Sequence, residues 1–210
     1  MKIESNRKQH AATKQPRIAA VVLAAGTSTR MGKNKLLTDI FGEVLVRRVV
    51  RAAEKSRARP IVVVTGQDHE FIRTALAETD TTLVYNPDFL EGMSTSLRVG
   101  IHAVSESDGA VILLGDMPGI TANLIDRMIA SFDPDQGRSI CVATYKGRRG
   151  HPVLFDHRFH AALQSISGDV GARQVLAANE EAICEVDGDD EAPLIDIDTP
   201  DDLARFFARQ

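Results

Sequence analysis

Three basic residues follow the first apolar run of the chain and could neutralise a polyphosphate. Residues 18–25 are all apolar, the run ends at Gly26, and Arg30, Lys33 and Lys35 come soon afterwards. Glycines at positions 26 and 32 allow the backbone to turn sharply and to approach a ligand closely. Backbone N–H groups in such a loop can hold phosphate oxygens, while the basic side chains balance their charge. The stretch therefore predicts a nucleoside triphosphate site.

This stretch differs from the common phosphate-binding motifs. A P-loop is one residue shorter between its glycines and carries Ser or Thr after the lysine, whereas Asn34 follows Lys33 here. The G-x-G-x-x-G pattern of dinucleotide sites is not present either. From the residue types alone, an ordinary strand-to-helix turn with basic side chains on its surface remains an alternative.

A regular alternation of strands and helices positions this loop. We predict buried strands at residues 18–25, 61–64, 82–85 and 110–114, helices at 43–58, 68–78, after 96 and at 121–132, and a small, hydroxylated loop at 92–96. Such alternation predicts a mostly parallel sheet with helices on both faces. Ligands of these sheets bind at the carboxyl ends of the strands. Those ends are Gly26, Thr65, Asn86 and Asp116, so we expect these residues to surround the site.

The second half of the chain is less regular. Strands are predicted at 139–144, 153–155 and 182–186, and helices at 157–164 and 170–178. Residues 146–152 form a basic, turn-rich loop in this interpretation. Thr199 is a candidate cap of the last helix, with Pro200 at its first position. No internal repeat or long linker divides the chain.

Composition limits the classes of partner and compartment. The chain has 210 residues, enough for one domain, with 43% hydrophobic residues and a net charge of −4, so no general attraction to nucleic acid or to an anionic membrane is expected. The basic cluster at 47–59 is interpreted as the solvated face of a helix. Cys141 and Cys184 have neither a pairing nor a metal-binding spacing, which favours a reducing, cytoplasmic compartment. No apolar run is long enough for a transmembrane helix. Residues 1–16 are interpreted as a disordered leader or an expression remnant.

Six stretches, in order along the chain, resemble the MobA-like nucleotidyltransferases. They are Leu23-Ala24-Ala25-Gly26 with Ser28, Arg30, Met31, Gly32 and Lys35; residues 92–97; residues 114–118; residues 149–155; Gly168-Asp169 with Gly171, Ala172 and Arg173; and residues 196–200 with Asp202 and Leu203. The opening stretch is specific for the superfamily, and the later ones are similar to the molybdenum cofactor cytidylyltransferase branch. Thr95 stands where Ser is more usual, and the resemblance covers roughly residues 18 to 205.

The resemblance implies a Rossmann-like, three-layer α/β fold with a mostly parallel, mixed sheet, of the nucleotide-diphospho-sugar transferase type, in one domain over 17–210. It also implies Mg²⁺-dependent transfer of CMP from CTP to the terminal phosphate of a molybdopterin, with release of pyrophosphate. A client molybdoenzyme or its chaperone is a further partner that the resemblance allows. The alternatives are a guanylyltransferase on the same cofactor, a transferase for another small phosphate-bearing metabolite, and a non-catalytic molybdopterin-binding delivery chaperone.

The site residues implied by the resemblance fall into groups. Arg30, Lys35 and Asp116 would be catalytic, and Asp116 with Asp198 would hold the metal, Asp196 being the alternative second carboxylate. The nucleotide would be bound by Leu23, Ala24, Ala25, Gly26, Arg30, Lys35, Thr65, Asn86, Ser96 and Gly115. The acceptor would be bound by Arg149, Gly150, His151, Pro152, Asp169 and Gly171, and the whole segment from Asp169 to Arg173 would line its pocket. Asp116 as a turn residue, Asp198 as a helix-terminal residue and His151 as a structural turn residue remain the alternatives.

Overall fold

The structure is a computed structural model that describes residues 15–27, 34–168 and 172–208. Most of the predicted leader, together with Arg30, Asp169 and Gly171, therefore lies outside the described residues. Within the described part, no helix is both long and apolar enough to cross a membrane.

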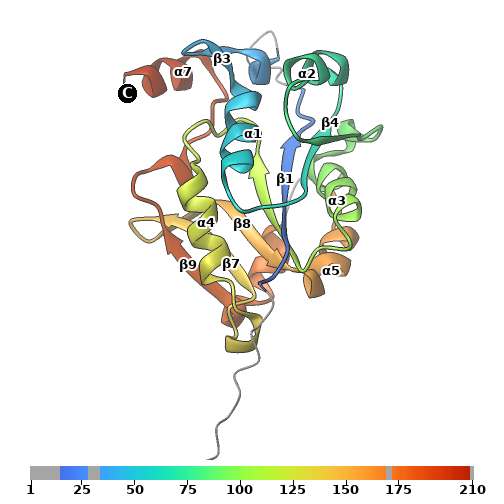
Figure 1. Ribbon diagram of the computed structural model, residues 1–210, viewed down its shortest axis with the longest axis vertical. Helices are drawn as coiled ribbons and strands as arrows, with labels where there is room; N and C mark the ends of the chain where they lie inside the picture. The colour runs from blue at the N-terminus through green and yellow to red at the C-terminus, as the bar shows by residue number, and fades with distance from the viewer. Residues whose placement is uncertain (1–14, 28–33, 169–171, 209–210) are drawn as a thin grey trace, which may run out of the picture.

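The described residues form a seven-stranded mixed sheet, drawn in Figure 1. Its order is β5 (Thr82–Tyr85), β4 (Ile61–Thr65), β1 (Ile18–Ala24), β6 (Gly109–Leu114), β8 (Arg148–Asp156), β7 (Ile140–Tyr145) and β9 (Ile183–Asp187). The first four strands are parallel, and β8 runs antiparallel to both of its neighbours. This arrangement confirms the predicted α/β fold with a mostly parallel, mixed sheet.

The central strands form where the sequence is continuously apolar. In β1, Ala19 to Val22 are fully buried, and in β4 Val63 and Val64 are fully buried as well. A strand that is covered on both faces needs apolar side chains on both faces. Apolar and polar residues therefore do not alternate along these strands. The predicted strands of the first half, at 18–25, 61–64, 82–85 and 110–114, are confirmed as β1, β4, β5 and β6.

Helices cover both faces of the sheet and complete three layers. One face packs against α1 (Leu45–Lys55), α2 (His69–Ala75) and α4 (Ala122–Ser131). The other packs against α3 (Met93–Ala103), α5 (His160–Ser165) and α6 (Arg173–Ala177). In Figure 1, α1 and α4 lie in front of the strands, while α7 (Pro200–Phe207) crosses the top. Short 3-10 turns span Lys35–Leu37, Phe89–Glu91, Pro134–Gln136, His157–Phe159, Glu180–Ala182 and Ala192–Leu194.

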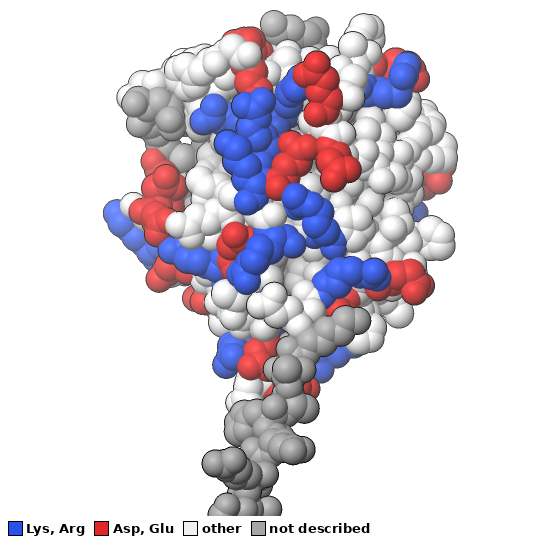
Figure 2. Space-filling view, viewed as in Figure 1, with Lys and Arg blue, Asp and Glu red and all other residues white. Residues whose placement is uncertain are grey.

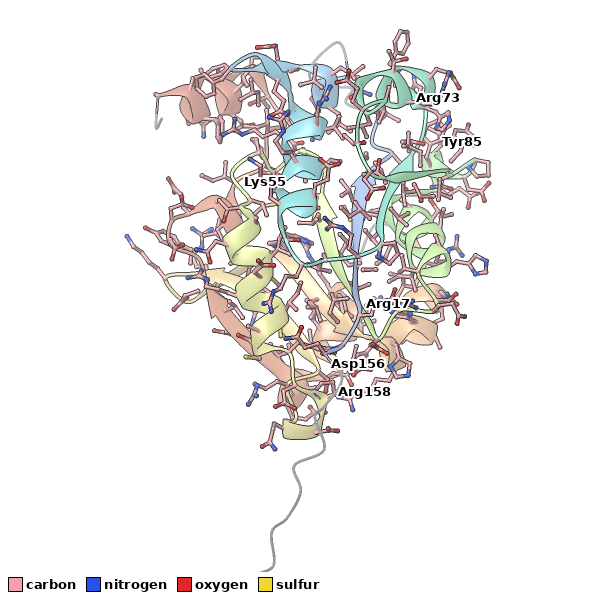
Figure 3. All side chains as sticks on the ribbon, in the orientation of Figure 1. Arg17, Lys55, Arg73, Tyr85, Asp156 and Arg158 are labelled. Carbon is pink, nitrogen blue, oxygen red and sulfur yellow. The ribbon has the colours of Figure 1, made fainter. Side chains whose placement is uncertain are left out.

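Figure 3 marks the two ends of this sheet. Arg17, which precedes β1, lies near Asp156 and Arg158 at the end of the sheet opposite the predicted site. Tyr85 marks the carboxyl end of β5, where the parallel strands finish. The predicted site therefore belongs to the end of the sheet that carries α2 and the 34–44 segment.

The basic cluster on α1 forms a solvated band, which Figure 2 shows interleaved with acidic side chains. Arg47 pairs with Glu78 at 2.9 Å, Arg51 with Glu43 at 2.9 Å, and Arg57 with Asp126 at 3.5 Å. These exposed pairs contribute little to stability individually.

Two predicted element boundaries are wrong for a common reason, which is local backbone geometry. The helix predicted from residue 43 begins at Leu45, because Glu43–Val44 is β3, which pairs with β2 (Asp39–Ile40) across Phe41 and Gly42, at φ 55° and 83°. The loop predicted at 92–96 is mostly helix, because Gly92 (φ 106°) turns the chain and α3 begins at Met93.

The loop predicted at 146–152 is also wrong for most of its length. Lys146 and Gly147 form a two-residue turn, at φ 50° and 73°, and β8 begins directly at Arg148. Two positive φ values suit a tight hairpin between twisted strands. The pairing then slips between Arg149 and Val153, so that Gly150, His151 and Pro152 bulge out of register with β7.

The two cysteines are neighbours in space, which their sequence spacing does not indicate. Cys141 on β7 and Cys184 on β9 are register partners in adjacent parallel strands, and both are free thiols. Burial, together with the nearby Cys184, raises the pKa of Cys141 to about 12. The Cys141 thiol is therefore an inert core group at neutral pH.

Candidate active site

Asp116 lies at the centre of the carboxyl edge of the sheet. The β1–β6 ladder runs as far as Leu23 opposite Leu114, and the Gly115 N–H then donates to the Leu23 carbonyl at 2.9 Å. A Cβ on Gly115 would lie 3.0 Å from that same oxygen. Glycine therefore lets β6 continue tightly against β1, and this places Asp116 directly beside the end of β1.

Lys35 reaches Asp116 from a separate short turn. The side chain of Asn34 caps the Lys35–Leu37 turn by accepting from the Leu36 N–H at 2.9 Å, and Leu36 is 3% exposed. These contacts fix the backbone of the turn. The Lys35 Nζ then donates to Asp116 Oδ2 at 2.7 Å and to Asp198 Oδ1.

Asp198 is brought to the same place by the segment before α7. The Ile197 N–H donates to the Asp116 carbonyl at 3.0 Å, and the Ile197 side chain is fully buried. Thr199 and Asp202 form a capping box that begins α7, which confirms Thr199 as the cap. Asp196 and Asp198 flank the anchored Ile197, so both are held at the edge of the sheet.

One carboxylate oxygen from each of Asp116, Asp196 and Asp198 lies within 4.8 Å of the others. From the sequence, Asp198 is preferred to Asp196 as the second metal ligand, whereas the structure brings both carboxylates close to Asp116. Burial, with the neighbouring charge of Asp116, raises the pKa of Asp196 above its ordinary value. Burial lowers the pKa of Lys35, but Asp116 and Asp198 more than offset this and leave it raised, so the ammonium is charged at neutral pH.

The cluster can accept a further cation. Asp116 Oδ1 is buried and has no hydrogen-bond partner, although Oδ2 of the same carboxylate is held by Lys35. Carboxylate oxygens are the ligands preferred by hard divalent ions. An unpartnered buried oxygen beside two other carboxylates fits such an ion.

Two cavities meet at this cluster. The first, of about 350 Å³, is lined by residues from β1 and from the start of α3, with Asp116 at its edge: Leu23, Ala25, Gly26, Thr27, Phe89, Leu90, Gly92, Met93, Ser96, Leu114 and Asp116. The second, of about 540 Å³, has an apolar floor that includes Leu97, Val142, Val153 and Phe155, with Arg148, Arg149, His151, Arg173 and Asp196 as its polar lining. Leu23, Met93 and Leu114 line both cavities.

The predicted nucleotide residues differ in where they lie. Leu23, Ala25, Gly26 and Ser96 line the first cavity. Thr65 and Asn86 are fully buried, and their polar side-chain atoms bond within the protein: Thr65 Oγ1 is 2.6 Å from His69 Nδ1. Ala24 and Gly115 lie at the edge of the sheet without lining the cavity, Lys35 belongs to the carboxylate cluster, and Arg30 lies outside the described residues.

Asn86 connects the end of β5 to the first turn of α3. Its Nδ2 donates to Thr95 Oγ1 at 2.8 Å and to Ser96 Oγ at 3.0 Å, and its Oδ1 accepts from the Asp88 N–H at 3.0 Å. Every polar atom of the Asn86 side chain is thus satisfied within the protein. The residue positions Ser96, which itself lines the cavity.

We expect Asn86→Ala to lower the free energy of unfolding by about 2 kcal/mol, because it removes the hydrogen bonds that this fully buried side chain makes to Thr95, Ser96 and the Asp88 N–H. Denaturant unfolding followed by circular dichroism measures this change. Asn123→Ala, at an exposed position on α4, is the matched control and should change stability by less than about 0.5 kcal/mol. Equal stability of the two variants would contradict the connecting role of Asn86.

Four of the six predicted acceptor residues, Arg149 to Pro152, belong to β8 at or beside its bulge. Arg149, Gly150 and His151 line the second cavity, whereas Pro152 is buried beneath it. The guanidinium of Arg149 also forms ion pairs with Glu180 at 2.9 Å and with Glu185 at 2.8 Å. Gly150 lies so close to the 192–195 turn that a Cβ would stand 1.9 Å from the Pro193 carbonyl oxygen.

Burial lowers the pKa of His151, so its ring is neutral at neutral pH, and Nδ1 is buried without a partner. A neutral imidazole offers one donor and one acceptor nitrogen. Arg173, which ends the 169–173 segment assigned to the acceptor pocket from the sequence, also lines the second cavity. Met93 and Asp196 line it as well, although neither was predicted as an acceptor residue.

Comparison with known proteins identifies one family over most of the chain. Residues 20–183 match the family described as MobA-like NTP transferase domain. The nicotine blue oxidoreductase of Paenarthrobacter nicotinovorans is 28% identical over 93% of this chain and 98% of its own. The molybdenum cofactor cytidylyltransferase of Escherichia coli is 27% identical over 89% of this chain and 93% of its own.

A solved structure of similar shape contains a metal. The crystal structure of Rv0371C from Mycobacterium tuberculosis in complex with manganese has a TM-score of 0.78 and 26% identity. The match covers 92% of this chain and all of that one. The likeness supports the fold described above and shows that a protein of this shape can be crystallised with a divalent ion.

Proposed function

Because the chain belongs to the MobA-like NTP transferase family and is a nucleotidyltransferase, we propose that it transfers CMP from CTP to a molybdopterin-type acceptor. The terminal phosphate of the acceptor attacks the α-phosphorus of CTP. The bond from that phosphorus to the β-phosphate oxygen breaks, and pyrophosphate leaves. The products are the cytidylyl cofactor and pyrophosphate.

One observation carries this proposal, which is the meeting of two cavities at the carboxylate–lysine cluster. Asp116 lines the cavity beside Gly26, and Asp196 lines the cavity beside His151. A donor in one cavity and an acceptor in the other would place their phosphates side by side at the cluster. Proximity and charge neutralisation are the main requirements of such a transfer, and no protein nucleophile is needed.

The first cavity is proposed to hold CTP. Backbone groups at Gly26 and Thr27 would contact the triphosphate, and Ser96 would help to hold the nucleoside. Lys35, with Arg30 from the part of the loop outside the described residues, would neutralise charge developing on the pyrophosphate. Lys35 is already charged and within reach of the cluster, which supports its assignment.

A divalent ion, proposed to be Mg²⁺, would be held by Asp116 and Asp198, with Asp196 as a third available carboxylate. The unpartnered Asp116 Oδ1 supports this assignment. When bound, the ion supplies positive charge against the phosphate oxygens. Asp116 is held in position by the Gly115–Leu23 hydrogen bond, and Asp198 by the anchored Ile197.

The choice of CTP is proposed from Ala25. In the MobA-like resemblance, guanylyl members usually have glycine at this position. Ala25 is 6% exposed and lines the first cavity, so its methyl group takes up space beside a bound base. The larger purine would meet this methyl group first, which favours the smaller pyrimidine.

The second cavity is proposed to hold the acceptor, with its polar groups toward Arg149, His151 and Arg173. Asp169 and Gly171 belong to the same proposed pocket but lie outside the described residues. A client molybdoenzyme or its chaperone would then receive the product.

His151→Ala is expected to raise the KM for the acceptor by about tenfold or more while leaving the KM for CTP within about twofold, because His151 lines only the second cavity. Steady-state kinetics with each substrate varied in turn measures this separation. His157→Ala, at an exposed position just beyond β8, is the control and should leave both constants unchanged. An equal loss of CTP affinity in His151→Ala would place the β8 bulge in the nucleotide site.

The function itself is tested by pyrophosphate release from each of the four ribonucleoside triphosphates, with Mg²⁺ and molybdopterin. Release with CTP, at least about tenfold faster than with GTP, is the expected result. A preference for GTP would indicate a guanylyltransferase. Turnover only with other phosphate-bearing acceptors would change the proposed acceptor, and tight cofactor binding without pyrophosphate release would indicate a delivery chaperone.

A further inference from the structure

Lys35 already occupies the carboxylates that the proposed function gives to a divalent ion. Its ammonium contacts both Asp116 and Asp198, and its side chain is only 11% exposed. Such a contact is poorly screened by solvent ions, so the attraction is strong. The ammonium of Lys35 therefore supplies the cluster with a cation from the protein itself.

The ammonium and a divalent ion compete for this place. Mg²⁺ requires oxygen ligands at about 2.0–2.1 Å in near-octahedral geometry. An ion bound by both Asp116 and Asp198 would lie within a few ångströms of an ammonium that bonds to the same two carboxylates, and the two cations would repel strongly. An ion can still approach the cluster at Asp116 Oδ1 and Asp196, because Lys35 contacts neither of these groups. Full engagement of Asp198 nevertheless requires Lys35 to leave.

Lys35 can leave without any change in the backbone. The turn that carries it is anchored by buried Leu36 and by the Asn34 cap, and Asn34 Nδ2 also donates to Asp68 Oδ2 at 2.8 Å. The lysine side chain itself is a flexible four-carbon chain that ends in a point charge. Asp116 lines the same cavity as Gly26 and Thr27, so phosphates bound there offer the ammonium new oxygen partners nearby.

We propose that Lys35 is an exchangeable counter-ion, which neutralises Asp116 and Asp198 in the nucleotide-free protein and moves to the phosphates when the nucleotide and a divalent ion bind. The inference rests on the nucleotide and metal sites of the proposed function. Its consequence is a binding order: the ion binds weakly alone, because it must displace Lys35, and tightly with nucleotide. Metal and nucleotide are therefore positively coupled, and part of that coupling passes through one side chain.

The test is Mn²⁺ binding to the nucleotide-free protein, measured from the electron paramagnetic resonance signal of free Mn²⁺. Lys35→Met removes the competing charge and keeps most of the length of the side chain. We expect its Kd for Mn²⁺ to be lower than that of the wild type by at least about tenfold. Lys55→Met, which removes the same charge from an exposed position on α1 labelled in Figure 3, should change the Kd by less than about twofold.

Two further measurements identify the site and guard against misfolding. The gain in Mn²⁺ affinity should disappear when Asp116→Asn is added to Lys35→Met, because the ion then loses the carboxylate of Asp116, its principal proposed ligand. Lys35→Gln provides a second neutral side chain, and the rise in Tm on adding Mn²⁺ should be larger in either Lys35 variant than in the wild type.

An unchanged or weaker Mn²⁺ affinity in both neutral variants would overturn the counter-ion role. Lack of saturable Mn²⁺ binding in all of these proteins would overturn it as well. Failure of the proposed function has a different signature, because the Mn²⁺ measurements contain no nucleotide. Tighter Mn²⁺ binding in Lys35→Met without any CMP transfer by the wild type would support the counter-ion and reject the activity.

Discussion

Asp116→Asn is expected to lower the rate of CMP transfer by at least about a hundredfold at ordinary Mg²⁺ concentrations. The substitution keeps the shape of the side chain at the junction of the two cavities but removes the charge that a divalent ion and Lys35 both require. Its effect on the stability of the metal-free protein should be small, because loss of the Lys35 contact is offset by weaker repulsion from Asp196 and Asp198. Steady-state turnover across a Mg²⁺ titration measures the effect.

Asp198→Asn is the matched control for this expectation. Asp198 is more exposed than Asp116, with 36% of its side chain accessible against 19%, and an amide oxygen can still ligate a hard cation. We therefore expect a milder loss that higher Mg²⁺ partly restores. Full activity of Asp116→Asn, or a divalent ion bound beyond coordination distance of Asp116 in a complex with CTP, would contradict the site.

Lys35→Ala should lower turnover by about two orders of magnitude or more while the protein remains folded. The proposed reason is that the ammonium neutralises charge on the leaving pyrophosphate, because the described lining of the first cavity contains no basic side chain of its own. Lys55→Ala, on the exposed face of α1, should retain wild-type turnover. Normal pyrophosphate release by Lys35→Ala would remove Lys35 from the catalytic group.

The sequence predicts well those parts of the fold in which the residue types follow directly from local burial or local capping. The runs at 18–25 and 110–114 are apolar throughout because β1 and β6 are covered on both faces. Their carboxyl ends then locate Gly26 and Asp116 without further information. The capping box of Thr199 and Asp202 is similarly local, so the start of α7 was predictable from a few residues.

The parts that the sequence leaves open depend on contacts between distant segments. Asp196 joins Asp116 only because Ile197 returns to the carbonyl of Asp116, 81 positions earlier in the chain. Lys35 likewise meets Asp116 and Asp198 across 81 and 163 positions of the chain, which a local motif does not indicate. The hydroxyl-rich start of α3 resembles a loop by composition, yet the turn at Gly92 allows the helix to begin at Met93. Asn86 was correctly placed at a strand end but is turned inward by Thr95 and Ser96.

The central claim is direct transfer of a nucleotide between two cavities that meet at Asp116 and Lys35. It is tested most directly by incubating the protein with CTP labelled at the α-phosphate, Mg²⁺ and molybdopterin, and by following the label and pyrophosphate together. We expect label to enter the acceptor in a one-to-one ratio with the pyrophosphate released, and we expect omission of the acceptor to abolish both. Label that stays in free CMP, becomes attached to the protein, or never leaves CTP would contradict it.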